Sequence, residues 1–266
     1  KIKFHTFGKL GVKMSGYNTK IITYKNQTQI KHYGRSIKTD YSLSDEQKKD
    51  RKRKADTERT PQQIAKSIES SRNRTINSIY QYALANDWEL FITLTFNPVK
   101  VDSKNYDSVV NALSNWFKKT KELYAPDLKY IIVPELHKNG GYHFHGLISD
   151  FGNLPLTIGK TTKSGDVIFN LISYNLGFST ATFVKSSDKC CSYILKYITK
   201  DLCAVTKNKK RYWCSKNLKK PKIETYEYMA DEFENSMKDL IDFIEYRKVV
   251  NIEKAHNQMK IYGLNI

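Results

Sequence analysis

The chain has 266 residues, of which 39% are hydrophobic and 12% aromatic, so it is long enough to bury a core and is not a wholly disordered chain. No apolar run approaches the roughly 18 residues of a membrane helix, no signal peptide is recognisable, and the four cysteines include no C-x-x-C pair, so we expect a cytoplasmic protein without a disulfide scaffold or zinc knuckle. The net charge of +18, from 45 Lys and Arg against 27 Asp and Glu, suits a polyanionic partner.

The first sixty residues combine strand-like patterning with strong positive charge. Residues 1–40 alternate Tyr, Ile, Val and Phe with polar residues, which predicts short strands or a hairpin. Residues 1–60 contain 16 basic and 6 acidic side chains, an excess of ten positive charges. The run that includes Lys52, Arg53 and Lys54 is expected to be exposed and to contact DNA phosphates, although a merely solvated surface would carry the same charge.

A helix is predicted to begin after Thr60, because a threonine cap, a proline at the first helical position and Gln63 three residues after the cap stand together. A strand of β-branched and aromatic residues follows at Phe91–Phe96 and ends at Asn97-Pro98. Residues 103–124 then show the apolar spacing of an amphipathic helix.

The segments 130–137 and 142–149 predict two strands of a β-hairpin, joined across a turn that contains two glycines. His143 and His145 are two residues apart, so their side chains point to one face while Phe144 points into the core. We expect Lys138 to pair with Tyr142 across a three-residue turn, which places Glu135 opposite His145 and His137 opposite His143. An even-length turn would put Glu135 on the wrong face.

This hairpin is a candidate metal site with Glu135, His143 and His145 as ligands. Two imidazoles and one carboxylate leave open positions and suit Mn²⁺, Fe²⁺ or Zn²⁺, and Mg²⁺ if waters complete its coordination. His137 is expected to lie behind the ligands or to face solvent. The alternative is an ordinary hairpin with polar faces, but three of the six histidines within nine residues argue against accident.

A strand is expected near residues 179–184, followed by a helix over about residues 186–202. In that helix Tyr193 and Tyr197 lie one turn apart on one face, with Lys196 and Lys200 at three- and four-residue offsets. Phenol has a reference pKa of about 10, and neighbouring ammonium groups favour the phenolate. Taken alone the pattern is typical of an amphipathic helix; together with the hairpin and the charge it indicates nucleophilic tyrosines.

Beyond this helix, residues 207–222 place eight Lys and Arg around two aromatic rings, a combination that suits a single strand whose bases can stack. Residues 224–246 predict one long amphipathic helix with an acidic outer face. We therefore divide the chain into a basic extension (1–59), a core (60–203) and a basic segment with a C-terminal helix packing on the core (204–266). The DNA-binding candidates are Lys52, Arg53, Lys54, Lys210, Arg211, Tyr212, Trp213 and Lys216.

These segments together resemble the HUH endonucleases, specifically the rolling-circle replication initiators of phages and plasmids. Phe91–Phe96 matches the family strand of the form aromatic-x-Thr-Leu-Thr-aromatic, and His143–Gly146 matches its His-hydrophobic-His-Gly motif. Glu135 matches the upstream carboxylate, and Tyr193–Lys200 matches the tyrosine-lysine helix in its two-tyrosine form. Order and spacing agree across roughly residues 88–203, and the segment 211–218 loosely resembles a basic segment that follows the core.

The resemblance implies an α+β fold: a central antiparallel sheet, or palm, flanked by helices, with a strand and helix extension before it and an amphipathic helix after it. It implies Mg²⁺ or Mn²⁺ held by Glu135, His143 and His145, and site-specific nicking and joining of single-stranded DNA at a replication origin in a bacterial host, with host replication proteins as further partners. Tyr197 would be the primary nucleophile and Tyr193 the second, each leaving a 5′-phosphotyrosine.

Three other functions share some of these residues. A relaxase or a single-strand transposase of the same superfamily would use the same chemistry. A two-histidine-one-carboxylate iron oxygenase would share the ligand set, but it has no use for paired tyrosines or for a charge of +18. A DNA-binding protein with a degenerate site is disfavoured because all the expected catalytic positions are occupied.

Overall fold

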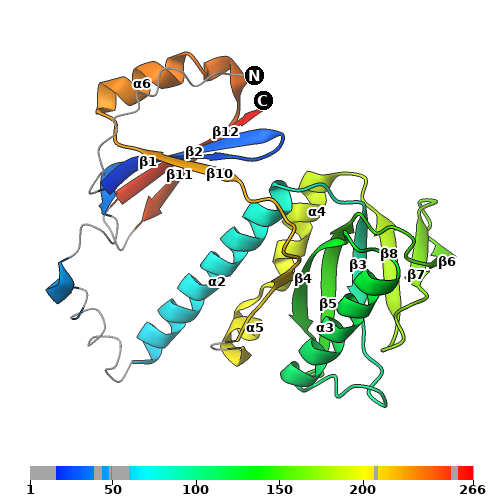
Figure 1. Cartoon of the computed structure of the whole chain (residues 1–266). Helices are drawn as coiled ribbons and strands as arrows, with labels where there is room; N and C mark the ends of the chain where they lie inside the picture. The colour runs from blue at the N-terminus through cyan, green and yellow to red at the C-terminus, as the bar shows by residue number, and fades with distance from the viewer. Residues whose placement is uncertain are drawn as a thin grey trace. The chain divides into compact units, whose positions relative to one another are not determined.

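The computed structural model describes residues 16–38, 44–47, 49, 60–206, 209–252 and 257–265. The chain forms two compact units, one from residues 1–59 and 221–266 and the other from residues 60–220 (Figure 1). Helices accompany a sheet in each unit, and the strand pairs in the described ranges are antiparallel, which confirms the expected α+β class. Across those same ranges, no helix has both the length and the apolar character needed to span a membrane.

The unit of residues 60–220 contains a seven-stranded sheet in the order β6-β7-β8-β3-β5-β4-β9. Its strands are β3 (Leu90–Leu94), β4 (Lys129–Leu136), β5 (Tyr142–Ser149), β6 (Leu156–Thr161), β7 (Val167–Leu171), β8 (Ser179–Phe183) and β9 (Trp213–Cys214). Its helices are α2 (Pro61–Leu84), α3 (Tyr106–Leu123), α4 (Ser187–Ile194) and α5 (Lys200–Val205), and the 3-10 turn η2 (Leu195–Tyr197) follows α4. The strands predicted near residues 91, 130, 142 and 179 are thus confirmed.

Helix α2 begins as the sequence predicts. The Thr60 hydroxyl accepts a hydrogen bond from the Gln63 backbone amide, and the Gln63 side chain accepts one from the Thr60 amide. This reciprocal cap satisfies two amides that have no partner inside the helix, a contribution of about 1 kcal/mol. It confirms that the helix starts at Pro61.

The two faces of the seven-stranded sheet serve different purposes. Helix α3 covers one face, where the rings of Phe117 and Tyr130 stack with their centroids 4.0 Å apart. Phe144 points to that same face and is fully buried. His143 and His145 point to the opposite face because side chains alternate along a strand, and there Tyr193 of α4 contacts Phe91 of β3 with a ring separation of 5.5 Å.

The helix expected over residues 186–202 is interrupted. Helix α4 ends at Ile194, η2 follows, and Ile198 and Thr199 adopt non-helical backbone angles before α5 begins at Lys200. Two contacts stabilise the break: the Thr199 hydroxyl caps α5 by accepting from the Leu202 amide, and Arg72 Nε donates to the Ile198 carbonyl at 2.7 Å. A threonine that caps a new helix competes with continuation of the old one.

The other unit contains a five-stranded sheet in the order β10-β1-β2-β12-β11. Its strands are β1 (Gly16–Thr23), β2 (Gln27–Lys38), β10 (Lys222–Tyr226), β11 (Ile244–Ile252) and β12 (Asn257–Asn265), with α6 (Ala230–Lys238) and the 3-10 turn η3 (Ile241–Phe243) between β10 and β11. Phe233, Met237 and Leu240 pack against Ile21 and Ile30 of the sheet. Figure 1 shows α6 lying across one face of these strands.

The single helix expected over residues 224–246 is a correction. Only residues 230–238 form a helix; β10 precedes it and pairs with β1, and β11 follows it and pairs with β12. Pairing with distant strands therefore overrides the helical periodicity of the segment. Residues 221–266 accordingly group with residues 1–59, whereas the sequence suggested that they pack on the core.

Candidate active site

Five strands, helices and turns bring the predicted catalytic residues to one face of the seven-stranded sheet. Glu135 lies near the end of β4, and His143 and His145 lie on the adjacent β5. Tyr193 lies near the end of α4, and Tyr197 ends the η2 turn. The pairing of β5 with β3 adds Thr93, which is directly opposite His145.

The hairpin has the expected parity but a different register. Glu135 pairs with His143 and Leu136 with Tyr142, so five residues, 137–141, make the turn. The turn is closed by a hydrogen bond from the His137 amide to the Gly141 carbonyl at 2.9 Å, and Gly140 has a φ of 83°, which favours glycine. The expected three-residue turn is therefore wrong, but an odd length still directs Glu135 and both histidines to one face.

The Glu135 carboxylate contacts two imidazoles. Its Oε2 atom lies 2.8 Å from Nε2 of His145 and 3.1 Å from Nε2 of His137. His137 in turn stacks on His143 with ring centroids 3.7 Å apart. The structure thus draws His137 into the cluster, more closely than expected.

His145 lies at the centre of this arrangement and is buried. Its Nδ1 atom is 3.1 Å from Oγ1 of Thr93, and its ring lies flat against that of Tyr197, with centroids 3.6 Å apart and planes inclined by 4°. A hydroxyl can donate or accept, so Thr93 is compatible with either neutral tautomer of His145. Thr93 is a site residue to which the sequence assigned no role; its place two residues from Phe91 in the same strand was the available signal.

Burial and hydrogen bonding set the charge of these groups. Burial raises the pKa of Glu135, but the hydrogen bonds and charges of His145 and His137 outweigh it, so the pKa lies below its ordinary value. Burial lowers the pKa of both His143 and His145, and Glu135 opposes this only in part. The cluster therefore presents an anionic carboxylate and neutral imidazoles near neutral pH, the forms that bind metal ions.

The donor types fit a divalent cation, although no three His, Cys, Asp or Glu side chains of the described residues stand as a ready-made cage. The separations of 2.8 and 3.1 Å between the carboxylate oxygen and the two nitrogens are close to the distance of about 3 Å between adjacent ligands when each metal bond is about 2.1 Å. His143, which stacks on His137, would have to turn about its side-chain bonds to join them. The fit lies in the chemistry and spacing of the donors.

The two tyrosines have different surroundings. Their rings are 5.7 Å apart, but Tyr193 is 47% exposed and Tyr197 only 7%. Nζ of Lys196 lies 3.3 Å from the centre of the Tyr193 ring and 4.9 Å from that of Tyr197. Hydrogen bonds from Lys196 and Tyr197 lower the pKa of Tyr193, whereas burial and the neighbouring Tyr193 raise that of Tyr197.

Lys200 is placed differently from the prediction. The break after Ile198 makes Lys200 the first residue of α5, where its ammonium pairs with Glu69 at 3.3 Å. Lys196 is therefore the lysine that the structure brings against both phenol rings.

The DNA-binding candidates separate into three groups. Lys52, Arg53 and Lys54 lie outside the described residues. Lys210 and Lys216 are exposed, as a phosphate contact requires. The aromatic candidates are partly buried: Trp213 packs against Phe144 at 5.5 Å and Tyr212 against Tyr82 at 6.4 Å.

Arg211 is a correction among these candidates. It is buried, and its guanidinium donates to Oγ of Ser71, to Oγ1 of Thr206 and to the carbonyls of Cys203 and Thr206. These bonds tie α2 to the end of α5. A guanidinium used inside the protein in this way does not reach DNA, so we assign Arg211 to the stability of the fold.

Residues 89–202 match the model of a family of replication-associated proteins, the ORF2 family. The matched range contains Thr93, Glu135, both histidines of β5 and both tyrosines. The match supports a rolling-circle replication initiator, a kind of protein that binds DNA at an origin. Neither the curated proteins nor the solved structures gave a match to the chain.

Proposed function

We propose that this protein is a metal-dependent endonuclease of the HUH type, with two tyrosines, that nicks and joins single-stranded DNA at a replication origin. The observation that carries the proposal is the placement of both phenols beside the carboxylate–imidazole cluster. Tyr197 stacks on His145, which contacts Glu135, and Tyr193 packs edge-on against Tyr197. The match to the replication-associated family supports it independently.

Glu135, His143 and His145 would hold Mg²⁺ or Mn²⁺, which when bound supplies positive charge to the oxygens of the scissile phosphate. Lys196, against the Tyr193 ring, favours the phenolate over the phenol. The phenolate oxygen forms a bond to phosphorus while the bond from phosphorus to the 3′ oxygen breaks. The products are a 5′-phosphotyrosine and a 3′ hydroxyl, and in the net balance the proton lost by the phenol is gained by the 3′ oxygen.

We propose that Tyr193 makes the first cut, which reverses the ranking that the resemblance implied. Its ring is 47% exposed and lies under the Lys196 ammonium, so an incoming strand can reach it without rearrangement of the protein. Tyr197 is 7% exposed and its ring face is covered by His145, so it has to move before it can attack. That order leaves Tyr197 for the second transfer, which joins the released strand.

The test is formation of a covalent adduct. The full chain is incubated with Mn²⁺ and single-stranded oligonucleotides labelled at the 3′ end, and the products are separated on a denaturing gel. We expect a labelled protein band that depends on the cation and is absent from the double variant Tyr193→Phe/Tyr197→Phe. A band of equal strength from the double variant would overturn the assignment of the nucleophiles, and the absence of any adduct with every origin-derived strand would overturn the proposed function.

A further inference from the structure

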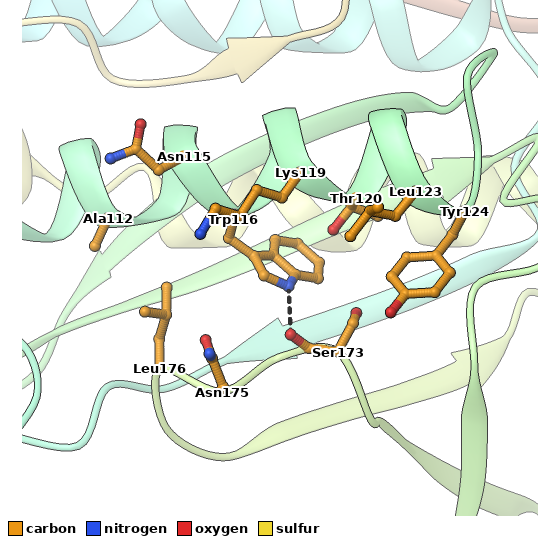
Figure 2. A pocket seen from close by; sticks show the side chains of 10 residues that line it. All are labelled: Ala112, Asn115, Trp116, Lys119, Thr120, Leu123, Tyr124, Ser173, Asn175 and Leu176. Atoms are coloured by element: carbon orange, nitrogen blue, oxygen red, sulfur yellow. Dashed lines mark hydrogen bonds between the residues drawn. The ribbon is translucent and has the colours of Figure 1, made fainter.

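A cavity opens between α3 and the loop that leads into β8 (Figure 2). Its volume is about 320 Å³, near the lower end of the range of roughly 300–1,000 Å³ for small-molecule sites. It lies on the face of the sheet that α3 covers, opposite to the face of His143 and His145. The proposed cleavage chemistry therefore leaves this cavity without a role.

Two buried hydroxyls in the cavity have no hydrogen-bond partner among the residues that the structure describes. They are Oγ1 of Thr120, a residue only 1% exposed, and Oγ of Ser173. Figure 2 shows the two hydroxyls at the space between the Trp116 and Tyr124 side chains. An unsatisfied buried hydroxyl is costly in free energy, so a ligand with hydrogen-bonding groups would be stabilised here.

The charge of the cavity favours an anion. Lys119 lines it, none of the ten lining residues is acidic, and the ammonium of Lys100 donates to the backbone carbonyl of Asn175 at 2.7 Å. Asn115 and Asn175 add amide groups that can both donate and accept hydrogen bonds. Cations, amides and aromatic walls in one cavity match the phosphate, the base edge and the flat ring of a nucleotide.

The cavity also opens at the end of the sheet that carries the candidate active site. Its loop, residues 173–176, leads to Ser179, which pairs with Leu94, and Leu94 pairs with Phe144, the residue between the two histidines. Phe178 follows this loop directly before β8, is 59% exposed, and is held by backbone hydrogen bonds to Thr95. A single strand that crosses this end of the sheet can contact both faces and stack a base on Phe178.

We propose that this cavity binds one nucleotide of the single-stranded DNA outside the cut position, with its base against Trp116 and Tyr124 and its phosphate at Lys119. The inference rests on the proposed function, because it assigns the cavity to the same DNA strand. Such a site would hold the strand in one register and so help to determine where the cut falls.

The first test is photocross-linking. Oligonucleotides that carry 4-thiothymidine at successive positions are bound to the full chain without a divalent cation, irradiated and digested, and the modified peptides are identified by mass spectrometry. We expect one position of the strand to cross-link to the segment that contains Trp116 and Tyr124. Cross-links confined to other segments at every position would overturn the proposal.

The second test compares two adjacent lysines of α3. Lys119→Ala removes a cation that lines the cavity, and we expect it to weaken binding of the strand by about three- to tenfold at moderate salt. Lys118→Ala is the matched control, because the Lys118 side chain is 76% exposed, pairs with Glu122 and does not line the cavity. Equal weakening by both variants would overturn the proposal, as would an unchanged affinity of Lys119→Ala.

Two further measurements separate this inference from the proposed function. Covalent adduct formation on an oligonucleotide too short to span both places should be the same for Lys119→Ala and the wild type. If the adduct forms but no cross-link reaches the cavity, the inference fails and the function stands. If free deoxynucleoside monophosphates quench Trp116 fluorescence but no strand cross-links there, the cavity is a nucleotide site and the assignment to the DNA strand is overturned.

Discussion

The imidazole of His145 and the phenol ring of Tyr197 lie face to face, with ring centroids 3.6 Å apart and planes inclined by only 4°. This contact joins the strand that carries the histidines to the turn that carries the second tyrosine. It also covers one face of the Tyr197 ring, whereas Tyr193 at 5.7 Å stays accessible. The order in which the two phenols act follows from this difference.

Single substitutions should separate the two tyrosines. Tyr193→Phe retains the ring contacts with Phe91 and Tyr197 and removes only the hydroxyl, so we expect it to lose most of the initial covalent adduct. Tyr197→Phe should still form that adduct but fail to transfer the strand in a joining assay. Adduct gels and joining assays with both variants measure this; an adduct that survives in Tyr193→Phe and disappears in Tyr197→Phe would restore the order implied by the resemblance.

Removal of the Glu135 charge should separate chemistry from DNA binding. Glu135→Gln keeps the size of the side chain but not its negative charge, so we expect Mn²⁺ binding to fall and adduct formation to drop by about two orders of magnitude or more. Affinity for the strand should change little, because it comes mainly from phosphate contacts with Lys and Arg. Electron paramagnetic resonance of Mn²⁺ and a binding assay in a cation-chelating buffer provide the two readouts. Cutting that is undiminished in chelator would contradict the metal assignment.

Thr93 should act by positioning His145. Thr93→Val has a similar shape but cannot bond Nδ1 of His145, which is 3.1 Å from the hydroxyl. Loss of a hydrogen bond that orients a metal-ligating imidazole typically lowers metal affinity by about 10- to 100-fold, and we expect that range for Mn²⁺. Thr93→Ser restores the hydroxyl and should restore the affinity. If Thr93→Val binds Mn²⁺ as the wild type does, the hydroxyl does not orient the ring.

Arg211 and Lys216 should respond to substitution in opposite ways. Arg211→Ala removes the bonds to Ser71 and Thr206 and leaves buried acceptors unpaired, so we expect the free energy of unfolding to fall by about 2–4 kcal/mol. Lys216→Ala, at an exposed position, should leave stability unchanged and reduce the slope of log K against log salt by about 0.7 if it contacts a phosphate. Thermal unfolding and salt titrations measure both effects; a normally stable Arg211→Ala with weakened DNA binding would return Arg211 to the DNA surface.

Local patterns in the sequence were sufficient for much of the larger unit. The Thr60 cap, the strands around residues 91, 130 and 142, and the shared face of His143 and His145 depend on short-range rules: hydrogen bonds within one turn of helix and the alternation of side chains along a strand. The parity of the hairpin turn belongs with these, because only an odd length directs Glu135 to that face.

Contacts between distant residues determined the rest. The register of the hairpin depends on how the turn at residues 137–141 closes, and the end of α4 depends on Arg72, which bonds the Ile198 carbonyl from another helix. The segment around residues 244–252 has the spacing of a helix but forms β11, because β12 supplies a partner for its backbone. Local periodicity cannot register such partners, and for the same reason the burial of Arg211 and the exposure of Tyr193 follow only from the packed fold.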